Sequence, residues 1–231
     1  MNIRRNDKII KRNARIGQIA MLTGLAVLAG GMFISFRYPD QFNLSLMALL
    51  LGFMLSQLGI FYSNRWGRRP RADELLDQAL KGLDKKFALF HYTTPVRHLL
   101  VGPSGLWVLL PFYQRGTITY AKDRWQQRGA NLYLKIFAQE GLGRPELEVA
   151  SEIDKLQSFL KKRLPEESLP TVQAALVFTS PKAVINIPAD ATPPAETVTL
   201  KDLKELVRKT EKGKALSLDK IQAIVDTLTT A

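Results

Sequence analysis

Two long apolar runs near the N-terminus dominate the pattern of hydrophobic and polar positions. Residues 16–36 and residues 43–63 each contain 21 positions without a charged side chain. A helix of that length rises about 30 Å, which matches the hydrocarbon core of a bilayer. Residues 37–42, which separate the runs, include Pro39 and allow only a tight turn. The pattern therefore predicts an antiparallel hairpin of two transmembrane helices.

This apolar block has two other interpretations, a buried hairpin of a globular protein and a cleaved signal peptide. A buried globular hairpin would rarely lack charged residues over so long a stretch. A signal peptide has a shorter apolar run that soluble sequence follows. Here a second apolar run follows at once. We therefore favour the membrane hairpin.

The remaining sequence, residues 72–231, has shorter periodic segments that are typical of a mixed α/β domain. Apolar residues at helical spacing predict helices over residues 72–86, 145–164, 200–209 and 216–228. Apolar runs with β-branched residues predict strands over residues 87–92, 96–101, 106–110, 116–120, 172–179 and 184–187. This order predicts a mixed central sheet flanked by helices, an α/β fold that follows the N-terminal hairpin.

Positive charge is concentrated at the two ends of the apolar block. The chain has 33 Lys and Arg against 21 Asp and Glu, a net charge of +12. Residues 1–15 carry six basic side chains against Asp7, and residues 64–71 carry four basic side chains. Lys and Arg beside a membrane span mark its cytoplasmic end. The flanking basic residues are Arg4, Arg5, Lys8, Lys11, Arg12, Arg15, Arg65, Arg68, Arg69 and Arg71.

This charge distribution predicts a two-span protein of the cell inner membrane, with both termini in the cytoplasm and the lipid bilayer as a partner. The expected parts are a basic N-terminus over residues 1–15, the hairpin over 16–63, a basic linker over 64–71 and a cytoplasmic domain over 72–231. The last part has 22 basic residues against 19 acidic residues, so it is nearly neutral. The charge of the domain therefore gives little support to a nucleic-acid partner.

The composition excludes several kinds of chemistry. The chain has no cysteine and two histidines, His91 and His98. Disulfides, thiolate nucleophiles and Cys-ligated metal clusters are therefore ruled out, and a His-rich metal site is not expected. The sequence contains neither a Walker A motif nor the G-x-S-x-G motif of a hydrolase nucleophile.

The segment after residue 71 resembles the NERD (nuclease-related) domain family. The resemblance begins with the run ADELLDQALKGLDKKFALFHYTTPVRHLLVGPSGLWVLLPFYQRGTI, in which HLLVGPSGLWVL has the family's hairpin turn and length. It continues through RPELEVASEIDKLQSFLKKRL and VQAALVFTS, and covers most of residues 72–210. It implies a restriction-endonuclease-like fold with a D…ExK active site, and membrane-anchored members are a known arrangement in the family.

The resemblance also implies that the active site is degenerate. Arg97 stands where the family has its Asp, and Leu110 and Phe112 stand where it has the Glu and Lys of ExK. The Gln of the following helix corresponds to Glu148, and only Glu74 keeps an acidic position. Phosphodiester hydrolysis by this fold needs a hard cation such as Mg²⁺ on carboxylate oxygens. We therefore expect no catalytic residue, metal or cofactor. The domain is expected to be a pseudoenzyme that acts as a binding or scaffold module, with an unknown protein partner.

One alternative is a metal-dependent nuclease that has relocated its carboxylates. Asp73, Glu74, Asp77 and Glu148 would then approach one another and hold Mg²⁺. Arg97 has two interpretations, a phosphate-binding residue in an altered pocket and a structural residue paired with an acid.

A further alternative is an oligomeric two-span protein with a soluble cap. Small residues at fourfold spacing let transmembrane helices approach closely. Packing within the hairpin and homo-oligomerisation both explain such rows, which are Ala48, Gly52 and Ser56, Ala20 with Gly24, and Ala26 with Gly30. A separate basic and aromatic cluster, formed by Lys122, Arg124, Trp125 and Arg128, is compatible with a nucleic-acid surface or with a solvated edge.

Overall fold

The computed structural model describes residues 1–129, 141–165, 170–213 and 216–229. These residues form two compact units. One unit contains residues 7–71, and the other contains residues 1–6 together with the described residues from 72 onward.

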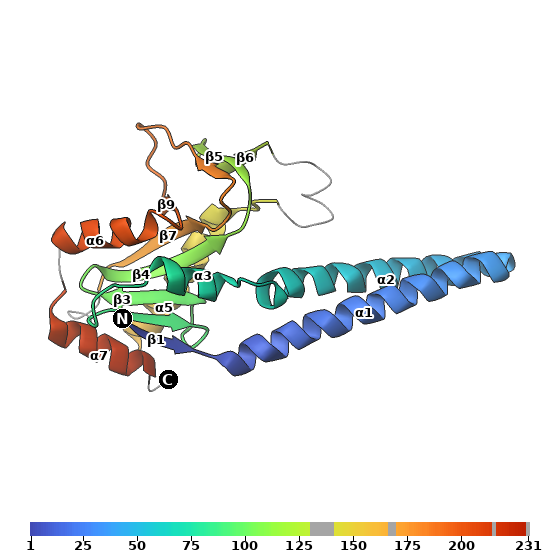
Figure 1. The fold of residues 1–231 in the computed structure, drawn as a ribbon, viewed down its shortest axis with the longest axis horizontal. Coiled ribbons are helices and arrows are strands. Elements are labelled where there is room, and N and C mark those ends of the chain that lie inside the picture. The colour runs from blue at the N-terminus through green and yellow to red at the C-terminus, as the bar shows by residue number, and fades with distance from the viewer. Residues whose placement is uncertain (130–140, 166–169, 214–215, 230–231) are drawn as a thin grey trace. The chain divides into compact units, whose positions relative to one another are not determined.

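The unit of residues 7–71 is a helical hairpin (Figure 1). Its elements are α1 (Asp7–Arg37), the 3₁₀ turn η1 (Pro39–Gln41), α2 (Phe42–Tyr62) and the π-helical turn η2 (Ser63–Gly67). The helices α1 and α2 are both long and apolar enough to cross a bilayer. The helix α1 begins well before the apolar run, because Asp7 in its first turn complements the helix dipole and the basic residues after it are good helix formers.

Glycine and serine residues bring the two helices of the hairpin close together. Gly17, Gly24 and Gly31 are buried along α1 at a spacing of seven residues. Ser45, Gly52 and Gly59 are buried along α2 at the same spacing. A Cβ added to Gly24 would lie 2.7 Å from the backbone nitrogen of Ser56. A Cβ added to Gly30 would meet nothing within 4 Å, so the predicted row of Ala26 and Gly30 is not part of the helix contact.

The second unit is built on a six-stranded mixed sheet. The strands, in spatial order, are β1 (Asn2–Arg5), β2 (Ala88–His91), β3 (His98–Gly102), β4 (Gly105–Phe112), β7 (Val172–Phe178) and β9 (Glu196–Thr199). The pairs β2–β3 and β3–β4 are antiparallel, and the other neighbouring pairs are parallel. The predicted hairpin turn between β3 and β4 is confirmed, and Gly105 adopts the positive φ of +101° that the turn requires.

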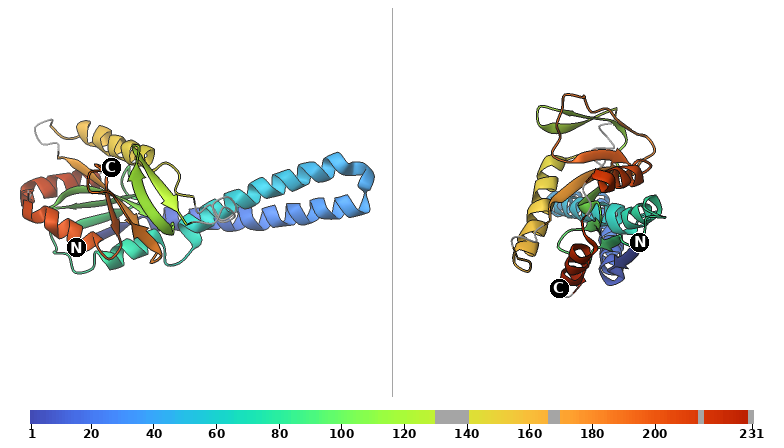
Figure 2. Two further views of the ribbon diagram at one scale, coloured as in Figure 1. Left: turned by 90° about the horizontal axis from the view of Figure 1, so that it is seen from above. Right: turned by 90° about the vertical axis from the view of Figure 1, so that its left-hand side faces the viewer.

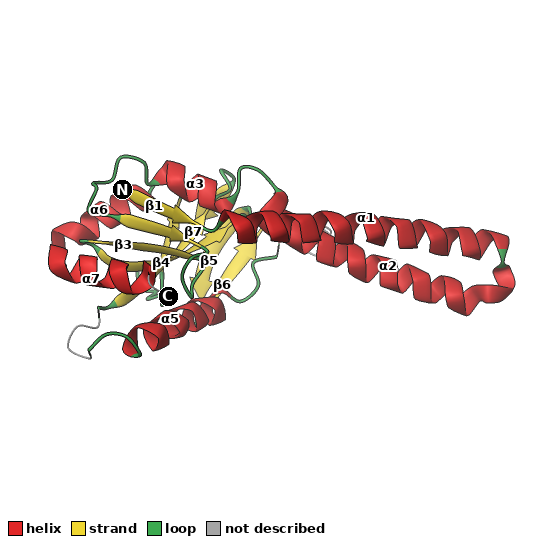
Figure 3. Ribbon diagram, turned by 90° about the horizontal axis from the view of Figure 1, so that it is seen from below, coloured by secondary structure: helices red, strands yellow, loops and turns green. Residues whose placement is uncertain are grey.

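Helices cover both faces of this sheet, as the sequence pattern predicts (Figures 2 and 3). The helices α3 (Ala72–Ala79) and α6 (Leu203–Gly213) pack on one face, where their buried residues join Leu100 and Trp107. The helices α5 (Pro145–Lys161) and α7 (Leu218–Thr229) pack on the other face with Leu99 and Val108. Neighbouring strand residues point to opposite faces, so each residue of β3 and β4 can be assigned to the α3 face or to the α5 face.

A second sheet has three strands, in the order β6 (Arg124–Arg128), β5 (Gly116–Ala121) and β8 (Ala183–Ile185). Trp125 in β6 is buried, and its ring makes an edge contact with Tyr120 at 4.8 Å between centroids. Its indole N–H donates to Thr197 Oγ1. Trp125 therefore cannot stack on a base. The cluster of Lys122, Arg124, Trp125 and Arg128 is better interpreted as a solvated edge, with its basic side chains exposed along the β5–β6 hairpin.

Some elements differ from the sequence-based prediction. The basic N-terminus over residues 1–15 contains two elements that were not predicted there, because residues 2–5 form β1 and α1 begins at Asp7. The strands β6 and β9 were not predicted, since both are short and largely polar. The predicted helix over residues 72–86 ends at Ala79, and Gly82 follows in a left-handed conformation with φ of +83°, which is typical of a chain leaving a helix.

Candidate functional site

The fold gathers four of the five positions singled out by the family resemblance on the α5 face. Arg97 lies just before β3, Leu110 and Phe112 lie on β4, and Glu148 lies in the first turn of α5. Glu74 lies on α3, on the other face of the sheet. The geometry of a shared site can therefore be assessed for the four positions on the α5 face.

Arg97 is bound to acidic side chains of α5. Its guanidinium forms an ion pair with the Glu148 carboxylate. The guanidinium also lies 3.9 Å from Glu152, and the Arg97 backbone N–H donates to Glu152 Oε2 at 3.4 Å. Glu152 is buried, and it also accepts a hydrogen bond from Lys155 Nζ at 2.9 Å. Arg97 is therefore a structural cation that satisfies two helix carboxylates.

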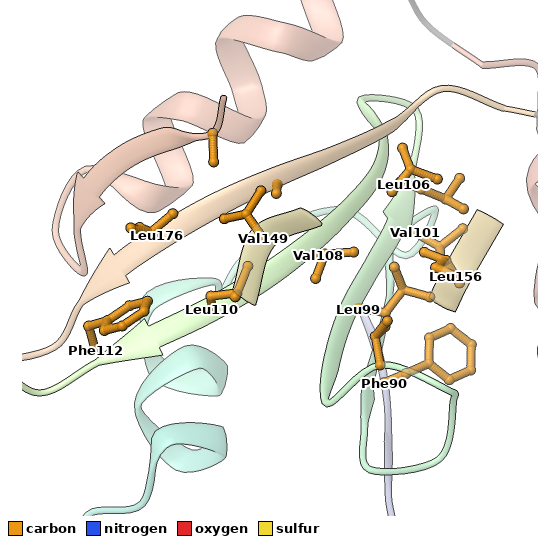
Figure 4. Packing of buried hydrophobic residues seen from close by; sticks show 14 of the residues in the cluster. Phe90, Leu99, Val101, Leu106, Val108, Leu110, Phe112, Val149, Leu156 and Leu176 are labelled. Carbon is orange, nitrogen blue, oxygen red and sulfur yellow. The ribbon is translucent and has the colours of Figure 1, made fainter. Parts of the chain in front are cut away.

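Leu110 and Phe112 belong to the hydrophobic core beneath α5 (Figure 4). Leu110 is 4% exposed and Phe112 is 7% exposed. The Phe112 ring stacks on Phe178 with 5.6 Å between the centroids, and Val149 of α5 belongs to the same cluster. Two apolar side chains thus occupy the positions that the resemblance aligns with a Glu and a Lys, and neither offers an oxygen ligand or a charge.

The carboxylates proposed for a relocated metal site do not converge. Asp73 and Asp77 lie on α3 and bind Arg5, whereas Glu148 lies on α5 across the sheet and binds Arg97. Within the part of the chain that the structure describes, no group of three or more His, Cys, Asp or Glu side chains is placed to hold a metal ion. The arrangement on the α5 face can anchor a helix to a sheet, but it lacks the ligands for Mg²⁺.

A polar network lies on the α3 face, and its first member is Arg5 of β1. Arg5 Nε lies 3.0 Å from Asp73 Oδ2, and its Nη2 forms an ion pair with Asp77. Asp73 is fully buried. A buried carboxylate needs an opposite charge to remain ionised without a large free-energy penalty. The N-terminal strand therefore supplies the charge that α3 requires.

The network continues from Asp77 into the sheet through two buried histidines. His91 Nε2–H donates to Asp77 Oδ1 at 3.0 Å, and the Nδ1 atoms of His91 and His98 lie 2.8 Å apart. A hydrogen bond between these two nitrogens therefore links the rings, with the proton carried by one of them. Burial lowers the pKa of His98 well below its ordinary value, and the nearby His91, Arg97 and Arg5 add to the effect. His98 is therefore a neutral structural side chain near pH 7.

The structure changes the role of two basic residues that were predicted to flank the membrane. Arg5 belongs to the ion-pair network of the α3 face. Arg4 points to the opposite face, where it hydrogen-bonds Thr229 of α7 and lies 5.8 Å from the centre of the Phe90 ring. Sequence reasoning missed these roles because the partners follow more than 65 residues later in the chain, as the pairing of Arg5 with Asp73 shows. The alternation of two arginines along a strand is the only local signal.

The other flanking residues stay within the hairpin unit. Lys8, Lys11, Arg12 and Arg15 have exposed side chains on the first turns of α1. The Arg65 guanidinium lies 5.8 Å from the centre of the Phe61 ring. Arg68 and Arg69 are exposed, and Arg71 is partly buried.

Comparisons of the chain with family models, with curated proteins and with solved structures give no match. The resemblance to the NERD family therefore stays a prediction from the quoted residues. The function proposed below rests on those residues and on the geometry of the two sheet faces.

Proposed function

We propose that this protein is a membrane-anchored module with a NERD-like, restriction-endonuclease-like domain that no longer catalyses nucleic-acid cleavage. It acts by binding or scaffolding at the cytoplasmic face of the inner membrane. The observation that carries the proposal is the α5 face, where Arg97 pairs with Glu148 above the buried Leu110 and Phe112.

Catalysis by this kind of site depends on a cation that orients a water molecule and offsets charge on the phosphate. A guanidinium at the position of the Asp repels such a cation, and leucine offers it no ligand. Restoring the site would need an Asp in place of Arg97, a Glu in place of Leu110 and a Lys in place of Phe112. Because all three positions differ at once, loss of catalysis is a better explanation than the movement of one ligand to a neighbouring position.

The anchoring part of the proposal is supported by the surface of the hairpin. Large apolar side chains are widely exposed on both helices, for example Leu22, Phe33 and Met54. Such a continuous apolar surface is unfavourable in water and is stable against lipid tails. The pairing of β1 with β2 supports a topology with both ends on one side, because β1 precedes α1 and β2 follows α2.

Packing within the hairpin accounts for most of the small residues that suggested an oligomer. A Cβ added to Gly52 would meet the backbone of Leu28 at 2.8 Å, and Ser56 donates a hydrogen bond to the Gly52 carbonyl. The homo-oligomer stays a prediction, and substitution of Gly52 cannot test it because that substitution would disturb the hairpin itself.

The proposal predicts that the purified full chain neither binds Mg²⁺ or Mn²⁺ nor cleaves nucleic acid. Calorimetric titration in detergent would measure metal binding, and single- and double-stranded DNA and RNA would be the cleavage substrates. The full chain is required because Met1–Asn6 belongs to the sheet unit. We expect no saturable metal binding and no metal-dependent cleavage.

Two variants interpret a contrary result. Metal binding and cleavage that Glu148→Gln abolishes would place a working site on the α5 face. If Glu74→Ala abolishes metal binding and cleavage instead, the site lies on the α3 face. Either outcome would contradict the proposed non-catalytic role and favour the nuclease alternative.

A further inference from the structure

Basic and apolar side chains share one exposed face at the start of α1. Lys11, Arg12 and Arg15 are followed by Ile16 and Ile19. Their spacing of three and four residues places them on one side of the helix. All five side chains are exposed, and they line a shallow hollow of about 350 Å³. The face is cationic near the helix start and apolar beyond it.

The three cations on this face have no acidic partner among the residues that the structure describes. Arg5, a few residues earlier, is bound to two aspartates. By contrast, Lys11, Arg12 and Arg15 form no ion pair with any residue in the described ranges. Exposed cations next to an apolar surface are stable when an external anion lies beside them.

The second basic segment of the hairpin, residues 64–71, lies beside the first turns of α1. The helices are antiparallel, with Gly17 beside Tyr62 and Gly24 beside Ser56. The turn η2 also packs against α1. If this register is continued toward the start of α1, Arg15 lies at the height of Arg65 along the hairpin, and Arg12 lies at the height of Arg68. Positive charge is therefore concentrated at one end of the hairpin.

We propose that this face of α1 binds an anionic phospholipid of the surrounding bilayer. Lys11, Arg12 and Arg15 contact the headgroup phosphate, and the acyl chains run along Ile16 and Ile19. Arginine binds phosphate through two parallel N–H groups, and cations beside a membrane span attract anionic lipid. The inference rests on the proposed membrane anchoring, and it names the lipid class that the hairpin selects.

The test uses the full chain in nanodiscs that contain equal parts of phosphatidylglycerol and phosphatidylcholine with identical acyl chains. Native mass spectrometry of the released protein measures the ratio of the two lipids that stay bound. We expect the natural chain to retain phosphatidylglycerol by about fivefold or more over phosphatidylcholine. The combined variant Lys11→Gln, Arg12→Gln and Arg15→Gln should lose this preference.

Two control variants separate a binding face from net charge and from misfolding. The variant Lys122→Gln, Arg124→Gln and Arg128→Gln removes the same charge from exposed positions of the β5–β6 hairpin and should keep the preference. The variant Lys11→Arg, Arg12→Lys and Arg15→Lys keeps the charge on α1 and should also keep it.

The outcomes distinguish failure of this inference from failure of membrane anchoring. Equal retention of both lipids by the natural chain, or equal loss of preference in the β5–β6 variant, would overturn the lipid site while leaving the anchor intact. Failure of the natural chain to enter nanodiscs made of phosphatidylcholine alone would instead overturn the anchoring on which the inference rests.

Discussion

Ionisable residues buried in the sheet unit are held by partners that lie on other strands or helices. Asp73 depends on Arg5, and His91 and His98 depend on each other and on Asp77. The buried Asp73, His91 and His98 each have a charged or hydrogen-bonding partner, as low-dielectric surroundings require. These residues therefore stabilise the unit, and the titration of His98 links its stability to pH.

The stability of the sheet unit should fall as the pH decreases below about 6.5, in part because of His98. Its pKa in the folded protein is lowered from the ordinary value of 6.5. Below that value the unfolded chain binds a proton at His98 that the folded chain does not, so unfolding becomes more favourable as the pH falls. The loss can reach about 1.4 kcal/mol per pH unit and ends once the pH passes below the folded pKa.

The variant His98→Gln tests this dependence. Urea unfolding of the full chain, followed by the fluorescence of the buried Trp107 and Trp125, would give the free energy of unfolding between about pH 7 and pH 5.5. We expect the variant to be less stable at pH 7, since it loses a buried hydrogen bond, and to show a weaker pH dependence. Identical pH slopes in the two proteins would contradict the role given to His98.

The sequence was enough to single out positions on the α5 face, but it was not enough to identify the partners of the buried ionisable residues. Arg97, Leu110 and Phe112 could be singled out from one predicted strand hairpin, because turn and spacing are local features. Pairing of Arg97 with an acid was one of its two interpretations, and the structure supplies Glu148 and Glu152. The role of Arg5 could not be predicted, because it depends on a strand whose neighbour begins at Ala88.

At the scale of elements, the hairpin depends on small residues at the contact between α1 and α2. Gly24 and Gly52 face each other closely enough that a Cβ on Gly52 would lie 3.0 Å from the Gly24 carbonyl oxygen. The fourfold rows in the sequence identified both residues. They also included Gly30, and they missed Gly31, because the row that faces a partner helix is set by the tertiary contact.

Gly24 and Gly30 form a matched pair of test positions. Gly24→Ala should separate the helices, since its Cβ would clash with Ser56, and overpacking of this kind costs about 1–3 kcal/mol. Gly30→Ala should leave the hairpin unchanged, because its Cβ meets open space.

Distance measurements between two spin labels would check this prediction. The chain has no cysteine, so Ala29→Cys and Met47→Cys, both at exposed positions, provide unique attachment sites. We expect longer or broader distances in Gly24→Ala and an unchanged distribution in Gly30→Ala. Equal effects of the two substitutions would refute the assigned helix contact.

At the scale of the whole molecule, the sheet unit is assembled from both sides of the hairpin in the sequence. The chain forms β1, continues through α1 and α2, and returns to add α3 and the remaining strands. The two apolar helices, the mixed sheet and its helices on both faces could be predicted, because each has its own hydrophobic period. The strands β1, β6 and β9 could not, because short polar strands are defined by their neighbours rather than by their own pattern.

The proposed anchor requires that the hairpin crosses a membrane and that both of its flanks lie on the cytoplasmic side. Single-cysteine variants of the full chain test this directly, with Asp40→Cys in the turn and Asn2→Cys, Lys122→Cys and Lys220→Cys at exposed positions of the sheet unit. A membrane-impermeant maleimide would be added to spheroplasts before and after permeabilisation. We expect Asp40→Cys to react in intact spheroplasts and the other three variants to react only after permeabilisation. Reaction of all four variants from the same side would contradict the membrane-spanning account.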